Sequence, residues 1–188
     1  MMVKIAYIVV AGMMLISAAA PGARADQRDP KLHELFQRLK LRELPPPEAQ
    51  AVEDQIWRIW HASGSPSTDL LLERVESMMA SDTLEPAVKL LDEVIALSPD
   101  FAEGWNKRAT VYFLRNDFRA ALRDTEHALR LEPRHFGAWS GLGAIFLELG
   151  QDAKALQAYQ EALKINPHLP DIAKEAERLN LTAKGRSI

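Results

Sequence analysis

The fold of this chain is decided by the stretch WSGLGAIFLELGQDAKALQAYQEALKINP, which runs from Trp139 to Pro167. Apolar residues recur in it every three or four positions, first as far as Phe146 and again from Ala155, and residues 149–152 interrupt them. This periodicity predicts two amphipathic helices joined by a short turn. Pro167 ends the second helix, because proline has no backbone N–H to donate and disfavours a helical residue before it.

The pattern returns at a period of 34 residues. Trp139 aligns with Trp105 one period earlier and with Leu71 two periods earlier, and proline recurs at positions 99, 133 and 167. Self-similarity at a fixed period indicates an array of similar structural units. Three units follow, at residues 68–101, 102–135 and 136–169.

Small residues in the third unit would let its two helices approach each other closely. Gly143 and Ala155 stand at this contact, and Trp139, Phe146 and Tyr159 fill the space around it. We therefore expect Trp139 to be a core residue whose truncation to alanine costs about 3–5 kcal/mol.

Acidic residues are expected to begin two of the helices. Asp82 with Glu85, and Asp100 with Glu103, have the spacing of a capping box. In this motif the first side chain accepts a hydrogen bond from the backbone of the first helical turn. Helix starts are therefore predicted directly after Asp82 and Asp100.

The large and small residues of the third unit stand at the spacing of a known repeat. They are Trp139, Leu142, Gly143, Phe146, Gly150, Ala155, Tyr159, Ala162 and Pro167. This pattern resembles the tetratricopeptide repeat (TPR) family. Residues 102–135 keep most of it, with Asn116 where the family usually has glycine, and residues 68–101 keep less of it.

The resemblance implies an all-α fold, a right-handed α-solenoid of helix-turn-helix repeats. In this family the first helices of successive repeats line a concave groove that holds a peptide or a helix of a partner protein. By register, the corresponding groove positions here are Asp69, Leu72, Glu73, Glu76, Met79, Glu103, Asn106, Lys107, Thr110, Phe113, Gly137, Ser140, Gly141, Ala144 and Leu147.

The residues at these positions suggest how a partner would bind. Gly141 and Ala144 leave room for a bulky apolar side chain, Asn106 is expected to bond the partner backbone, and Lys107 or the acids of the first unit would meet a charge. The cation-rich pattern of chaperone-tail adaptors is absent, because Leu72 and Glu76 occupy two of its positions. A free C-terminal carboxylate is therefore a poor candidate ligand.

Two further segments flank the array. Residues 26–67 are expected to form a helical hairpin and linker, with apolar faces in 31–42 and 47–62 separated by three prolines. Residues 170–188 are expected to form a C-terminal capping helix and tail. Both flanks are expected to cap the array, because a solenoid exposes apolar surface at its ends unless a further element covers it.

Residues 1–25 have the organisation of a secretory signal peptide. Lys4 precedes an apolar run at residues 5–16, and the segment ends in Ala23-Arg24-Ala25. A basic start, a short apolar stretch and a small-x-small site predict cleavage after Ala25 and an exported, periplasmic protein. The alternative is an uncleaved N-terminal anchor in the inner membrane, which would be the chain's sole membrane contact.

Composition and motif searches argue against other classes of function. The chain of 188 residues has a net charge of −3, no basic tract and no cysteine, which argues against nucleic-acid binding, disulfides and thiolate chemistry. No histidine pair has metal-ligand spacing, Ser140 is not in a hydrolase motif, and the glycines form no dinucleotide-binding motif. We therefore expect no catalytic residues, metal site or cofactor.

Two functions remain open. The first is a non-catalytic scaffold of the cell envelope that binds another envelope protein through its groove. The alternative is a structural module that forms homo-oligomers, in which Trp57, Trp60 and the N-terminal hairpin pack against a second copy.

Overall fold

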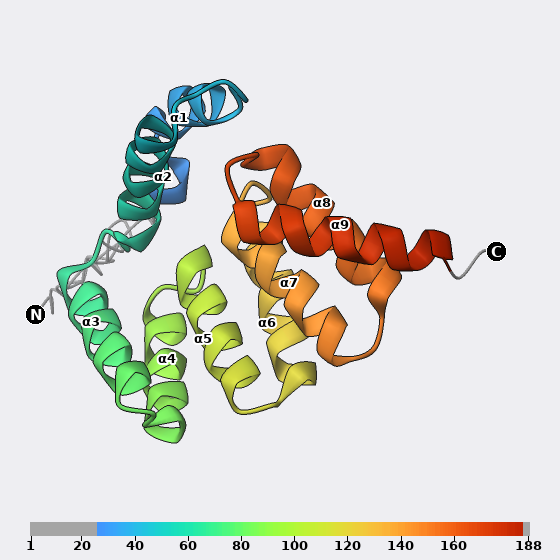
Figure 1. Cartoon of the computed structure of the whole chain (residues 1–188). Coiled ribbons are helices and arrows are strands. Elements are labelled where there is room, and N and C mark those ends of the chain that lie inside the picture. Colours follow the sequence, from blue (N-terminus) through green and yellow to red (C-terminus); the bar gives the residue numbers. More distant parts are fainter. Residues whose placement is uncertain (1–25, 186–188) are drawn as a thin grey trace, which may run out of the picture.

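A computed structural model describes residues 26–185, in which all regular structure is helical (Figure 1). The elements are η1 (Asp26–Arg28), α1 (Lys31–Leu39), α2 (Pro46–His61), α3 (Pro66–Ala80), α4 (Leu84–Leu97), α5 (Ala102–Leu114), α6 (Phe118–Leu131), α7 (Phe136–Glu148), α8 (Asp152–Ile165) and α9 (Pro170–Gly185). The all-α prediction is confirmed. The predicted signal peptide at 1–25 lies outside the described residues, and none of the helices between 26 and 185 is long and apolar enough to span a bilayer.

The helices α3 to α8 form three successive helix-turn-helix units. Figure 1 shows the pairs α3–α4, α5–α6 and α7–α8 following one another around a curved array, and α9 packs on α8. The two later pairs pack more extensively than α3 and α4 do. The weaker repeat pattern at 68–101 thus corresponds to a looser helix pair.

The turn inside each unit has the same backbone geometry. Asp82, Asn116 and Gly150, which are 34 residues apart, have φ angles of 56°, 62° and 68°. The residue after each of them donates its N–H back to the last helical turn, for example Asp117 N to Tyr112 O at 2.9 Å. This is a left-handed helix end, which glycine, asparagine and aspartate tolerate better than other residues. It explains why Asn116 can replace the usual glycine.

Close packing inside the third unit depends on Gly143. A Cβ atom at this position would lie 2.4 Å from the Tyr159 ring, which is itself buried. The expected close approach of α7 and α8 at Gly143 is therefore present. Beyond this contact, Ala176 and Leu179 of α9 pack in the same buried cluster as Ala155 and Tyr159 and cover the end of the array.

Trp139 is not the core residue that the sequence suggested. It is partly exposed, and its indole Nε1 donates to the Pro133 carbonyl at 2.9 Å. Trp105 makes the same 2.9 Å bond to the Pro99 carbonyl. The repeat tryptophans therefore lie over the proline turns between units, and Trp139→Ala should cost less than a full core truncation.

The two predicted capping boxes are wrong. Helix α4 follows Thr83 and α5 follows Phe101, and neither start has a side-chain cap. Asp82 is used in the left-handed turn instead, and Asp100 faces Arg28 at 3.9 Å. Side chains do cap α3, α6 and α7, and the capping residues are Ser65, Asp117 and His135.

The N-terminal hairpin packs in a place that local sequence did not reveal. Its helices α1 and α2 bury Leu32, Val52 and Ile56 between them, and the same cluster includes Phe136 at the start of α7 and residues 165 and 169 near the α8–α9 connection. The hairpin therefore contacts the later repeats, whereas a cap next to the first unit had been expected. The cause is the apolar face of α2, which finds its buried partner at Phe136.

Candidate partner-binding groove

A cavity of about 300 Å³ lies between the first helices of the second and third units. Six groove positions taken from the repeat register line it together, from α5 and α7. Helices α2 and α6 supply further walls. The lining residues, named here as the groove pocket, are Trp57, Asn106, Ala109, Thr110, Phe113, Thr125, Gly137, Gly141, Ala144 and Ile145.

Helical periodicity explains why α5 and α7 each present a continuous wall. Asn106, Thr110 and Phe113 are spaced by four and three residues on α5, and Gly137, Gly141 and Ala144 have the same spacing on α7. Apart from Ile145, the residues of α7 that line the pocket are small. A Cβ atom at Gly141 would have nothing within 4 Å, so the pocket is open at that point.

Trp57 of α2 closes one end of the groove pocket, and sequence reasoning did not place it there. A Cβ atom on Gly137 would lie 2.6 Å from Cη2 of the Trp57 ring. This close approach makes Gly137 necessary for the observed ring position. The signal available in the sequence was weak, because Trp57 lies only at the edge of the apolar face formed by Val52, Ile56 and Trp60.

A buried carboxylate next to the pocket ties α2 to the array. Glu103 on α5 is 2% exposed, and its two oxygens lie 3.1 Å from His61 Nε2 and 3.0 Å from His135 Nε2. His135 accepts the Ala138 N–H at its Nδ1, so its Nε2 donates to Glu103. Burial alone would raise the pKa of Glu103, but the hydrogen bonds from His135 and His61, with Lys107 nearby, lower it to about 2.

The polar groove residues are engaged within the chain. Asn106 donates from Nδ2 to Glu103 at 2.8 Å, and Lys107 Nζ pairs with Glu76 at 2.6 Å. The Thr110 hydroxyl donates to the carbonyl of residue 106, and the Ser140 hydroxyl donates to the carbonyl of residue 136. Asn106 and Lys107, which were expected to bond a partner, therefore already have acidic partners within the chain, and their role toward a partner protein stays a prediction.

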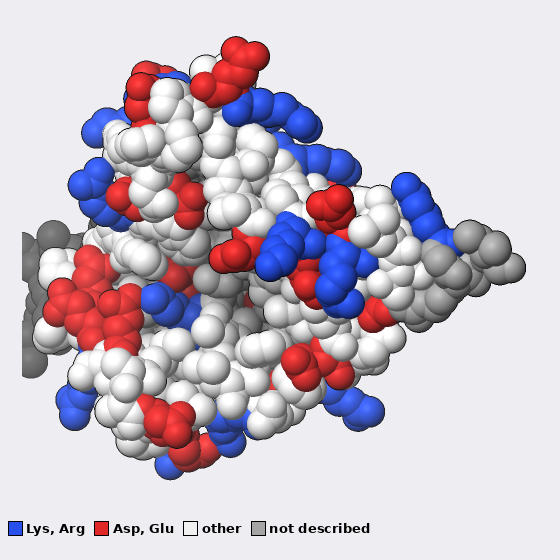
Figure 2. All heavy atoms as spheres, viewed as in Figure 1, with Lys and Arg blue, Asp and Glu red and all other residues white. Residues whose placement is uncertain are grey.

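The remaining predicted positions lie outside the groove pocket. Leu72 is 5% exposed and belongs to the core between α3, α4 and α5, so it does not face a partner. Asp69 accepts from the Ser63 backbone and hydroxyl, and Glu73 is exposed. Leu147 packs against the Tyr159 cluster. Figure 2 shows acidic side chains gathered on the α3 side of this face and mostly uncharged surface over α5.

The chemistry available in this region is that of a binding surface. Between residues 26 and 185, no group of three or more histidine, cysteine or acidic side chains is placed to hold a metal ion. The groove pocket itself contains no titratable side chain. What it offers is an apolar recess with aromatic walls at Trp57 and Phe113.

Comparisons with known proteins agree with this geometry. The sequence model described as tetratricopeptide repeat matches residues 106–170. A TPR repeat-containing protein of Rhizobium etli is 38% identical over 172 residues, covering 88% of this chain and 84% of that protein.

Solved structures show the same fold at low sequence identity. The Sgt2 TPR domain from Aspergillus fumigatus superposes with a TM-score of 0.62 at 21% identity, over 65% of this chain and 83% of that one. The first TPR domain of Spaghetti, bound to an HSP90 peptide, gives 0.60 at 20% identity, over 62% and 93%.

Proposed function

The chain belongs to the tetratricopeptide repeat family, and from that premise we propose that it is a non-catalytic scaffold that holds a partner protein in the groove pocket. TPR proteins mediate protein–protein interactions. The single observation that carries the proposal is the cavity of about 300 Å³ between α5 and α7, with small residues on one wall and aromatic rings on the other two sides.

The proposed ligand is one bulky apolar side chain from a peptide or helix of the partner. Gly141 leaves open space, and Trp57 and Phe113 offer aromatic surface to it. The polar groups nearby already have partners, so the ligand gains mainly from apolar burial. Burying one leucine or phenylalanine contributes about 1.5–3 kcal/mol, which fits a single anchor in a helix-in-groove or extended-peptide complex.

Related solved domains support a peptide ligand. The Spaghetti TPR domain holds an HSP90 peptide in a solved complex, which shows that this fold accommodates a peptide. A mode that depends on a free terminal carboxylate is not proposed for this chain, because Leu72 is in the core and Lys107 is paired with Glu76. The anchor side chain, and not the peptide end, is the recognised feature.

Export is part of the proposal. The basic start, apolar run and small-x-small site of residues 1–25 support cleavage after Ala25 and a periplasmic location, where the partner would be another envelope protein. Mass measurement of the protein isolated from its native cells tests this. A mature chain starting at Asp26 is expected, whereas an intact leader in a membrane fraction would favour the anchored alternative.

The hairpin tryptophans leave little exposed surface through which a second copy could bind. Trp60 is 2% exposed and packs within its own chain against Phe36, His135 and Phe136. Trp57 is directed into the groove pocket. A second copy could reach Trp60 only if the hairpin left the array, and it could reach Trp57 only through the groove pocket itself, so the groove scaffold is the better-supported function.

Site-specific photocrosslinking with a pocket-filling variant tests the groove. A photoreactive residue at Thr110 should capture a distinct protein in cells, and the same residue at exposed Lys184 should not. Gly141→Phe should abolish this capture without loss of stability, because a side chain there meets open space first. Ala96→Phe, on the exposed side of α4, is the matched control. Capture from Thr110 that persists in Gly141→Phe would contradict the proposal.

A further inference from the structure

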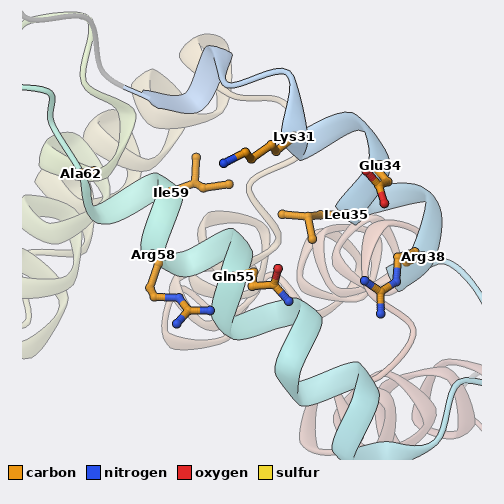
Figure 3. A pocket seen from close by; sticks show the side chains of 8 residues that line it. All are labelled: Lys31, Glu34, Leu35, Arg38, Gln55, Arg58, Ile59 and Ala62. Atoms are coloured by element: carbon orange, nitrogen blue, oxygen red, sulfur yellow. The ribbon is translucent and has the colours of Figure 1, made fainter.

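A second hollow lies within the N-terminal hairpin, away from the groove pocket. It has a volume of about 420 Å³, opens between α1 and α2, and shares no lining residue with the groove pocket (Figure 3). Its inner surface includes Leu35 and Ile59, which are buried and partly buried. We call this hollow the hairpin cleft.

Three cations surround the hairpin cleft. Lys31 and Arg38 reach it from α1 and Arg58 from α2, and Glu34 is the sole acid in its lining (Figure 3). All three cationic side chains are exposed, and within residues 26–185 none of them makes an ion pair or a side-chain hydrogen bond. The cleft lining therefore has an excess of positive charge, and none of its three cations is held in an ion pair by the described part of the chain.

Several arginines of the repeats are instead paired with acids. Arg108 bonds Asp92 and Asp124, Arg115 pairs with Glu85 at 2.7 Å, and Arg134 pairs with Glu132. The charge of these three arginines is compensated within the array, whereas Arg119 and Arg123 of α6 are, among residues 26–185, as unpaired as the cations of the cleft. The guanidinium groups of Arg38 and Arg58 keep their planar set of donors available, and such groups bind carboxylates through two parallel bonds.

We propose that the hairpin cleft is a second docking surface, for a segment of a partner protein that carries several carboxylates around one bulky apolar side chain. The carboxylates would meet Lys31, Arg38 and Arg58, and the apolar side chain would rest on Leu35 and Ile59. Charge complementarity of this kind sets specificity and association rate. The surface is independent of the groove pocket and would add a second contact to one partner or recruit another.

The composition of the cleft favours an acidic protein segment over a lipid surface. Membrane-binding patches typically hold about four to eight clustered cations. Here three cations share the rim with Glu34 and enclose an apolar floor. A recess of this shape accommodates one side chain of a protein segment, whereas the headgroups of a lipid bilayer would contact a flat basic surface.

Fluorescence anisotropy with a defined probe tests the proposal. The probe is a fluorescein-labelled dodecapeptide that repeats three glutamates and one leucine, and its counterparts carry lysine for glutamate or alanine for leucine. The decisive variant is Arg38→Glu with Arg58→Glu. The matched control is Arg119→Glu with Arg123→Glu, two exposed α6 arginines that have no partner among residues 26–185.

Wild type and the α6 control should bind the glutamate–leucine probe equally, and the cleft variant should bind it about tenfold more weakly or worse. The lysine probe should not bind, and the alanine probe should bind more weakly. If circular dichroism shows that the cleft variant is unfolded, Arg58→Gln decides, with an expected loss of about threefold.

Three results would overturn the proposal. The first is equal probe binding by wild type and the cleft variant, or no binding at millimolar protein. The second is sedimentation with phosphatidylglycerol vesicles that the cleft variant loses while no probe binds, which would assign the cations to a membrane. The third is a dimer of the wild type that the cleft variant loses in the absence of any probe binding, which would assign the cleft to a second copy.

Discussion

The tryptophans of the N-terminal hairpin and those of the repeats lie in opposite surroundings. Trp60 of α2 is 2% exposed and stacks on His135 with ring centroids 4.2 Å apart. Trp139 of α7 and Trp105 of α5 are partly exposed, and each donates its indole N–H to the carbonyl of the preceding unit's proline. The residue type is the same, but one tryptophan joins distant parts of the chain and the other two cover turns between neighbours.

This contrast shows two ways in which the chain is held together. The repeats are stabilised by similar contacts between adjacent units, so each contact is present in more than one copy. The hairpin is joined to the array by contacts that occur once, at Trp60, at Trp57 and at Glu103 with its two histidines. Losing one of the single contacts should therefore have the larger effect.

The largest effect is expected for Trp60→Ala. Removing this buried ring leaves a cavity between α1, α2 and α7 and should cost about 3–5 kcal/mol in the free energy of unfolding. Trp139→Ala should cost only about 1–2 kcal/mol, because its ring is already partly in water. Urea unfolding of both variants measures the difference. Equal losses would mean that the repeat tryptophan is as important as the hairpin tryptophan, and the comparison would fail.

A pH-dependent effect of intermediate size is expected for Glu103→Gln. The pKa of Glu103 falls from 4.5 to about 2 in the folded protein. The ionised form therefore stabilises the fold above the unfolded pKa, and that stability is lost as the pH falls from about 4.5 toward 2. The full shift corresponds to about 3 kcal/mol.

Urea midpoints between pH 7 and pH 2 measure the contribution of Glu103. The acid-induced loss of stability should be smaller in Glu103→Gln than in wild type, because the glutamine cannot take up the proton. Glu73→Gln, an exposed change on α3, should leave the loss of stability at low pH the same as in wild type. If the urea midpoint of Glu103→Gln falls at low pH as steeply as that of wild type, the hairpin is not held through this carboxylate.

The smallest effects are expected for two glycines on opposite sides of α7. Gly143→Ala drives a Cβ atom into the Tyr159 ring, at 2.4 Å, and should cost about 1–3 kcal/mol. Gly141→Ala meets no atom within 4 Å and should be neutral or stabilising by up to about 1 kcal/mol, because alanine is the better helix former. Thermal unfolding of the two variants shows whether Gly143 lies in the packed contact between α7 and α8 and whether Gly141 faces the open groove pocket. Similar melting temperatures would contradict both assignments.

Local pattern predicted the repeat array well and the polar contacts poorly. The spacing of Trp139, Gly143 and Pro167 was sufficient for the helix pairs, because each pair is formed by residues close in sequence. The same register brought Thr110 and Gly141 to one cavity. It could not show that Asn106 and Lys107 bond Glu103 and Glu76, because a side chain's choice of partner depends on which acids come within about 3 Å.

The sequence by itself determined the all-α repeat fold and the two helices that wall the groove pocket. These features follow from a 34-residue period and helical spacing, which act between neighbours along the chain. Only the tertiary structure decided where the hairpin lies. His61 meets Glu103 across 42 positions, and Glu53 meets Asn166 across 113. Such contacts depend on the curvature summed over all repeats and on the direction of one linker, so no local pattern contains them.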